Sequence, residues 1–245
     1  MINTKSILLG LLIGTIFNVS SSNKKKLEQV EVYFNIRRYD HIINELKQIL
    51  KVSQLIEDGI AKQYEFGIKD ILDVIDSYES VKKYEKSINQ SISDYDKLKL
   101  KYKKLFNKEY QKIDKYYDTI PTPNNFLKFF KNDNFNLLKI DYEFKHKNLK
   151  ITQTMVEKNK KLVEEQKKKF NVGEITKVDL AIAEKYLLQN KLELLNLEFD
   201  LFILKYKLFI TLQYYDKYAY QKLIESLPNI RDYLKSEIYE TILKI

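Results

Sequence analysis

The stretch KKFNVGEITKVDLAIAEKYL, residues 168–187, holds a glycine between two segments of charged, helix-forming sequence. The chain has only 5 glycines among 245 residues, so Gly173 marks a place where the backbone needs unusual freedom. A glycine at a helix end adopts positive φ without a Cβ clash, which stops the helix and reverses the chain. Thr176 and Asp179 then have the spacing of a capping box for a new helix. The stretch therefore predicts a tight turn between two helices.

A second stretch, YEFGIKDILDVIDSYES at residues 64–80, repeats this pattern. Both contain an aromatic residue, two further residues and a glycine, then an aspartate six positions on, followed by Val or Leu. The copies are 106 positions apart, the interval from Gly67 to Gly173. A repeat of that length with an internal break predicts a duplicated helical hairpin. The matched pairs are Tyr64 with Phe170, Gly67 with Gly173, Asp70 with Thr176, and Asp73 with Asp179.

The composition favours long helices. Only 3 prolines accompany the glycines, and 31% of the residues are charged and 44% hydrophobic, a balance typical of helical proteins. The segment DTIPTPNN, residues 118–125, separates two halves, because proline prevents a helix from continuing. We therefore expect an all-α chain of two long antiparallel coiled-coil hairpins. The first would span 22–120 with its tip at 67–73, the second 121–213 with its tip at 173–179, and 214–245 would form short helices.

Apolar residues at alternating spacings of three and four predict the seams along which these helices pack. Helices of about 40 residues would be ~60 Å long, so we expect each to pair with its neighbour and with other chains. Around the first tip the expected seam is Leu46, Ile49, Ile56, Ile60, Ile71, Val74, Tyr78, Val81, Ile88, Ile92, Tyr95 and Tyr102, interrupted by Ser53 and Glu85; before the second tip it is Ile151, Met155, Leu162 and Phe170.

The segment 199–212 is apolar on several faces and could be mistaken for a transmembrane helix. Asp200, Lys205 and Lys207 lie within it, and charged residues are costly inside a bilayer. We expect a helix buried in the fold or between subunits.

The N-terminal residues 1–21 have the pattern of a secretory signal peptide. Lys5 precedes an apolar run over 7–17, and small residues place cleavage near Ser21. The run is too short for the ~20 residues of a spanning helix, although a membrane anchor is the alternative. We therefore expect an exported protein.

Several classes of chemistry are not indicated. The chain has no cysteine. Its net charge is +9, but its basic residues are interleaved with acidic residues along the sequence. His41 and His146 stand far apart among charged residues, where we expect surface positions. No phosphate loop, nucleophile elbow or metal-ligand cluster is present. We therefore expect that the protein is not an enzyme and binds no cofactor, metal or nucleic acid. The alternative of a cytoplasmic nucleic-acid binder would require the N-terminal segment to remain uncleaved.

The duplicated tip resembles that of the TolC-like outer-membrane efflux proteins. One of their periplasmic tips, with the helix leaving it, is similar to FNVGEITKVDLAIAEKYLLQNKLEL. A helix approaching a tip in the family is similar to VEVYFNIRRYDHIINEL. The segment that opens each family repeat is similar to NNFLKFFKNDNFNLLKIDYEFKHKNLKI. The similarity spans about 30–212 and is strongest at the tips. The resemblance implies a homotrimeric channel-tunnel for efflux or type I secretion, in the periplasm or outer membrane of a Gram-negative bacterium, whose tips meet an adaptor and an inner-membrane pump.

The resemblance also implies roles for individual residues. Asp73 and Asp76 match the paired acids that the family points into its pore, and rings of carboxylates favour cations. Tyr64 and Lys69 match positions that tether one hairpin to the next, and Asp179 matches the acid they reach. Such an exposed link is worth only about 0–1 kcal/mol.

The chain also departs from the family pattern. Family members are longer because each half carries a pair of β-strands for an outer-membrane barrel, and no alternating pattern of ~10 residues is present here. The two-acid tip comes first here and second in the family. We expect the α-barrel-type periplasmic half without evident β-barrel strands. The alternative function is a non-conducting periplasmic coiled-coil tether or structural binding module.

Overall fold

A computed structural model describes residues 21–111, 126–130 and 135–225, and in this part of the chain every regular element is a helix. The expected all-α fold is confirmed. Four helices of 36 to 45 residues dominate, each roughly 54–68 Å long. They are α2 (Ser21–Glu65), α3 (Ile71–Phe106), α4 (Asn136–Asn171) and α5 (Lys177–Tyr215), accompanied by the short helices η1 (Phe126–Phe129) and α6 (Lys217–Glu225).

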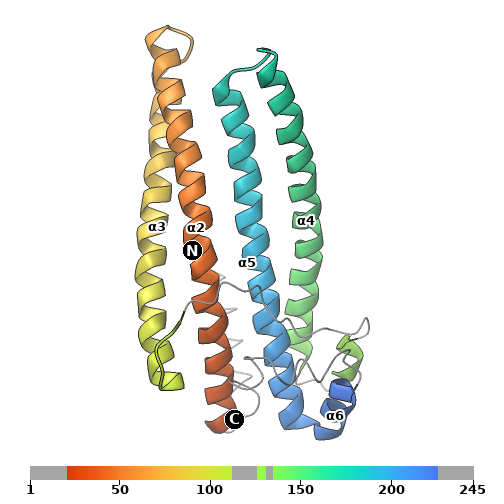
Figure 1. Ribbon diagram of the computed structural model, residues 1–245. Coiled ribbons are helices and arrows are strands. Elements are labelled where there is room, and N and C mark those ends of the chain that lie inside the picture. Colours follow the sequence, from red (N-terminus) through yellow and green to blue (C-terminus); the bar gives the residue numbers. More distant parts are fainter. Residues whose placement is uncertain (1–20, 112–125, 131–134, 226–245) are drawn as a thin grey trace, which may run out of the picture.

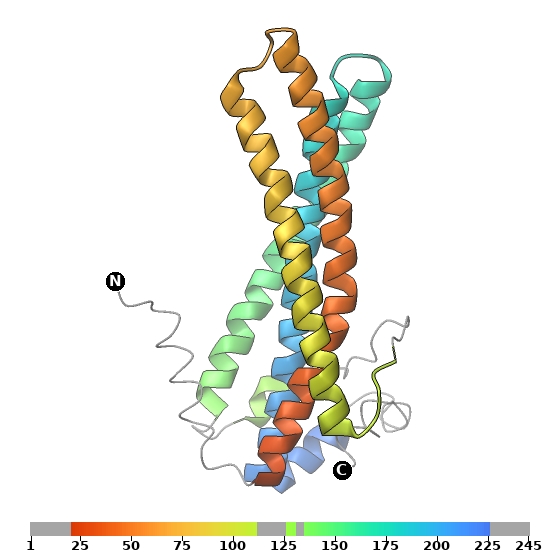
Figure 2. The same ribbon diagram turned by 90° about the vertical axis from the view of Figure 1, so that its left-hand side faces the viewer.

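The long helices form two antiparallel hairpins, α2 with α3 and α4 with α5, that lie side by side (Figures 1 and 2). The extensive contacts connect the helices in the spatial order α3, α2, α5, α4. The central pair, α2 and α5, joins the two hairpins, whereas α3 and α4 are the outer edges. Each pair of neighbours is antiparallel.

Both tips lie at the same end of the molecule (Figure 1). Two hydrogen bonds between α5 and α3 set their relative height: Lys185 Nζ donates to Ser80 Oγ over 2.6 Å, and Gln189 Nε2 donates to Tyr84 OH. Each bond joins residues 105 positions apart, one fewer than the 106-residue interval between the tip glycines. The two hairpins are therefore level to within about one residue.

The main hydrophobic core lies in the half of the molecule away from the tips, where α6 and η1 pack against the long helices. Aromatic side chains from α2 and α5, including Phe34, Phe199 and Tyr206, fill it. The expectation that 199–212 is a buried helix is confirmed. Within the described residues, no helix is both long and apolar enough to cross a membrane.

Two smaller clusters continue the core toward the tips. In the middle, Leu46 and Ile49 of α2 meet Tyr84 and Ile88 of α3. Nearer the tips, Ile56 of α2 packs on Val178 and Ala181 of α5. The first cluster packs the two helices of the first hairpin together, and the second packs the two hairpins against each other.

The predicted seam of α4 is wrong by one helical position. Ile151, Met155, Leu162 and Phe170 are all exposed. The side chains buried against α5 are instead Tyr142, Thr152, Val156 and Val163. The two rows lie next to each other on the helix, and each contains successive intervals of four and seven residues, which helical periodicity allows on either face. Periodicity alone therefore could not choose between them.

The seam around the first tip is correct on α2 and mixed on α3. Leu46, Ile49, Ser53 and Ile56 are buried as expected, and so are Val81, Ile88 and Tyr102, whereas Ile71, Tyr78 and Ile92 are exposed. The predicted row on α3 combined residues from an inner and an outer face. The predicted signal peptide, apart from Ser21, and the segments around Pro121, Pro123 and Pro228 lie outside the described residues.

Candidate functional site: the paired hairpin tips

The two tip turns share one backbone structure. Gly67 has φ 70° and Gly173 has φ 77°, the left-handed conformation that glycine adopts without strain. Their amides donate to the Tyr64 and Phe170 carbonyls over 2.9 and 3.0 Å, and the following amides also reach back at matched positions. These bonds satisfy carbonyls at the ends of α2 and α4. The matched turns support a duplication at the level of structure.

The capping boxes that the spacing predicts are present in both copies. The Asp73 amide donates to the Asp70 carboxylate over 2.9 Å, and the Asp179 amide donates to Thr176 Oγ1 over 3.2 Å. The acids accept in return from the cap amides, over 3.4 Å to Asp73 and 2.9 Å to Asp179. Each box orients the helix that leaves its tip.

The carboxylates near the tips differ in how they are engaged. Asp73 belongs to a capping box and also pairs with Lys69 over 3.4 Å. Hydrogen bonds from Thr176 hold the pKa of Asp179 below its usual value, and the charge of Lys69 adds to this effect. Asp76 is exposed and forms no ion pair within the described residues. Asp73 and Asp76 are the two predicted pore acids, and of these Asp73 alone is held in a capping box and an ion pair. The pore role of both residues stays a prediction.

The tether role predicted for Tyr64, Lys69 and Asp179 stays a prediction. Lys69 pairs with Asp73 of its own hairpin, although it lies near enough to Asp179 to affect its pKa. Tyr64 is 46% exposed beside the turn. The hydrogen bonds that join the hairpins start further from the tips, at Lys185 and Gln189. Burial, reinforced by the charge of Lys83, lowers the pKa of Lys185.

Two further contacts between the hairpins were missed from the sequence. A Cβ on Gly59 would lie 2.2 Å from Val178 Cγ2, so glycine allows α2 and α5 to approach closely. Further down, Asp200 of α5 pairs with Arg38 of α2 and, over 2.7 Å, with Lys145 of α4. The conspicuous glycine in a helical stretch was a usable signal for the first contact. The second joins residues far apart in sequence and had no local signal.

The tips themselves expose apolar side chains. Phe66 and Ile68 of the first turn are 79% and 69% exposed, and Val172 of the second is 70% exposed. Leu72, in the first turn of α3, is also exposed. Exposed apolar residues gathered in one place are characteristic of interaction surfaces. The end that carries the tips is therefore suited to contact another protein.

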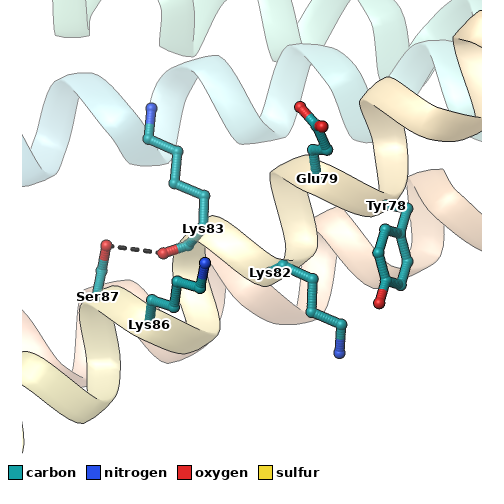
Figure 3. A pocket seen from close by; sticks show the side chains of 6 residues that line it. All are labelled: Tyr78, Glu79, Lys82, Lys83, Lys86 and Ser87. Carbon is teal, nitrogen blue, oxygen red and sulfur yellow. Dashed lines mark hydrogen bonds between the residues drawn. The ribbon is translucent and has the colours of Figure 1, made fainter.

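A hollow of about 750 Å³ lies on the outer face of α3 below the first tip. Glu79 and Lys83 point toward the α5 side, and Tyr78 and Lys82 point the other way (Figure 3). The lining residues all belong to α3: Tyr78, Glu79, Lys82, Lys83, Lys86 and Ser87. The hollow, called the α3 pocket below, is thus part of an edge of the helix layer and not a cleft between elements.

The described residues contain no group of three or more His, Asp or Glu side chains that could hold a metal ion. The histidines expected at the surface are half-buried: His41 lies beside the Phe199 ring, and His146 stacks on Tyr142. Burial and the charges of Lys150 and Lys205 lower the pKa of His146. Both imidazoles pack on aromatic rings of the core.

The chain was compared with protein-family models and with curated proteins. Neither comparison finds a match.

Proposed function

We propose that this chain is a TolC-like channel-tunnel component of an efflux or type I secretion system, exported to the periplasm or outer membrane of a Gram-negative bacterium. In this proposal three copies form the helical wall of a tunnel, and their tips meet an adaptor and an inner-membrane pump. The observation that carries it is the pair of matched tips, side by side at one end of a layer of four long helices. A chain with its tips at opposite ends could not line one opening.

The surface of the tip end supports the proposal. The exposed apolar residues Phe66, Ile68 and Val172 offer a contact for an adaptor. Asp76 lies one helical turn beyond the capping box. In an assembly of several copies, the Asp76 carboxylates would come together near the tip end. Such a ring attracts cations to a constriction.

Conductance of the purified protein in planar lipid bilayers tests the channel function. We expect discrete cation-selective openings, and we expect Asp76→Asn to lower the permeability ratio of potassium to chloride. Asp96→Asn removes an exposed charge near the other end of α3 and serves as the control. A ratio unchanged by Asp76→Asn would remove this residue from the pore.

Absence of any conductance, together with recovery of the protein in the soluble periplasmic fraction, would contradict the channel and favour the non-conducting coiled-coil tether. The long paired helices and exposed tips suit that role as well. The two functions differ in whether an aqueous path crosses the assembly, which conductance measures directly.

A further inference from the structure

The charges of the first hairpin differ between its two ends. The tip region, residues 57–79, contains two lysines and seven acidic residues. The opposite end, residues 21–31 and 101–111, contains seven lysines and three acidic residues. We call this end, where α2 begins and α3 ends, the basal end (Figures 1 and 2). The hairpin is therefore acidic at its tip and basic at its base.

The two stretches of the basal end lie at the same height. Lys101 of α3 pairs with Glu28 of α2 over 2.8 Å. One turn further along, Gln29 Nε2 donates to the Leu105 carbonyl over 3.3 Å. These contacts place the lysines at the start of α2 level with those at the end of α3. The basic residues thus form one surface and not two separate groups.

The fold leaves most of this positive charge without a counter-charge. Each acidic residue of the basal end is already engaged in an ion pair with a lysine: Glu28 with Lys101, Glu31 with Lys207, and Glu109 with Lys103. Like charges gathered in one place repel one another, and a negatively charged partner relieves this repulsion. Five lysines of the basal end form no ion pair within the described residues, and only Lys26 of them is half-buried, the others being exposed: Lys24, Lys25, Lys26, Lys104 and Lys108.

Helix α6 lies at the same end of the molecule and extends this surface (Figure 1). Lys217 and Lys222 are exposed and form no ion pair within the described part of the chain. Asp216 and Glu225 accept hydrogen bonds within their own segment. Tyr218 is 70% exposed, and the Lys222 ammonium lies 4.4 Å from the centre of its ring. Lysines beside exposed tyrosines are typical of surfaces at a membrane interface.

The kind of basic residue distinguishes between anionic partners. Nucleic-acid surfaces favour arginine, whose planar guanidinium binds phosphates and bases through paired hydrogen bonds. The arginines of the described residues, Arg37 and Arg38, are buried and half-buried, and Arg38 pairs with Asp200. The basal end presents only lysines, whose compact charges suit a layer of lipid headgroups. An anionic lipid surface therefore fits this end better than a nucleic acid does.

We propose that the basal end docks on a membrane surface rich in anionic phospholipids. The lysines of α2, α3 and α6 contact the headgroup phosphates, and Tyr218 lies among the headgroups. The acidic first tip is repelled by the same surface, so the tips point away from the membrane. The docking needs no aqueous path, and it holds for the proposed channel and for a non-conducting tether alike.

Co-sedimentation of the purified protein with lipid vesicles tests this docking. We expect binding to vesicles of phosphatidylglycerol and phosphatidylcholine in equal parts, and at least ~10-fold weaker binding to phosphatidylcholine alone. Salt raised from ~0.1 to ~1 M should weaken the binding, because the screening length falls from ~10 to ~3 Å. The triple variant Lys24→Gln, Lys25→Gln and Lys26→Gln should bind the mixed vesicles at least ~10-fold more weakly, since each lysine near the surface contributes about fivefold.

A second triple variant, on α4, is the matched control. Lys158→Gln, Lys160→Gln and Lys161→Gln remove the same charge from exposed lysines that form no ion pair within the described residues. These positions lie toward the tip end of α4. We expect binding within ~2-fold of the wild-type protein, because charges further than ~10 Å from the membrane are screened. Helicity by circular dichroism should be unchanged in both triple variants, since they alter surface side chains.

A tryptophan reporter identifies the end that meets the membrane. The chain has no tryptophan, so Tyr218→Trp and Tyr78→Trp each introduce one, at the basal end and at the α3 pocket near the first tip. Brominated lipid in the mixed vesicles should quench the fluorescence of the first variant and leave the second unchanged. The docking is overturned by equal binding to both kinds of vesicle, by equal weakening in the α4 control, or by quenching of Tyr78→Trp. Tighter binding to a DNA duplex at the same salt concentration would also overturn it and identify a nucleic acid as the partner.

Discussion

At the scale of single residues, the tips depend on two glycines whose conformation other residues rarely adopt. A Cβ on Gly173 would meet no atom within 4 Å, so the cost of a side chain there comes from its φ of 77° alone. We predict that Gly173→Ala lowers the free energy of unfolding by about 1 kcal/mol. Urea denaturation measures this, with Gly173→Asn as a milder variant because Asn tolerates this conformation. Greater stability of the alanine variant would contradict the turn.

The acidic residues of the first tip divide into a structural and a free group. Asp70 caps α3, whereas Asp76 is exposed and unpaired within the described residues. We predict that Asp70→Ala lowers the free energy of unfolding by about 1 kcal/mol, and that Asp76→Ala changes it by less than about 0.5 kcal/mol. Thermal unfolding of the two variants side by side checks this. Equal effects would show that Asp76 also stabilises the fold.

At the scale of helices, the junction between hairpins has one close approach and one ionic contact. A Cβ on Gly59 would lie 2.2 Å from Val178 Cγ2. Alanine improves helix propensity by about 1 kcal/mol, but overpacking costs about 1–3 kcal/mol. We predict that Gly59→Ala does not stabilise the protein, and that adding Val178→Ala recovers at least about 1 kcal/mol relative to additive effects. Additive free energies in this double-mutant cycle would mean that the helices are not in contact here.

The ionic contact joins three helices. Asp200 is half-buried between Arg38 and Lys145, so we predict that Asp200→Asn lowers the free energy of unfolding by about 2 kcal/mol. Asp96→Asn, which breaks an exposed pair with Lys99, is the control and should cost at most about 0.5 kcal/mol. Equal effects of the two substitutions would contradict a joining role for Asp200.

The stabilisation by Asp200 should depend on pH. Burial alone would raise the pKa of this carboxyl, but the Arg38 guanidinium and the Lys145 ammonium hold it below its ordinary value. A pKa lowered in the folded state stabilises the fold above the unfolded value of about 4, and this stabilisation is lost as the pH falls through the folded value. The difference between wild type and Asp200→Asn should therefore be constant near neutral pH and shrink below about pH 4. A difference that grows on acidification would contradict this assignment.

The sequence predicts the tips far better than the faces of the helices. Gly173, Thr176 and Asp179 act on their immediate neighbours, so their spacing was sufficient to predict the turn and its capping box. The row containing Met155 was assigned to the inner face of α4 and lies on the outer one, because two adjacent rows fit the same period. The contacts of Asp200 depend on which helices become neighbours, and that is a property of the whole chain.

At the scale of the whole molecule, the fold is an open layer of helices with both tips at one end. Its outer helices, α3 and α4, carry exposed apolar side chains. The main core lies away from the tips, and the tip half is held by smaller clusters and a few polar contacts. This distribution leaves the tips exposed at the end of long, stiff hairpins. The proposed tunnel requires that the tips be level.

The distance between the two tips tests that requirement most directly. Spin labels on Ile68→Cys and Glu174→Cys, which are both exposed in the tip turns, report this distance by pulsed electron paramagnetic resonance in protein diluted with unlabelled chain. Neighbouring helices pack ~8–10 Å apart, so we predict a distance below ~30 Å. Helices of this length would separate tips at opposite ends by more than ~50 Å, and a distance in that range would contradict the account.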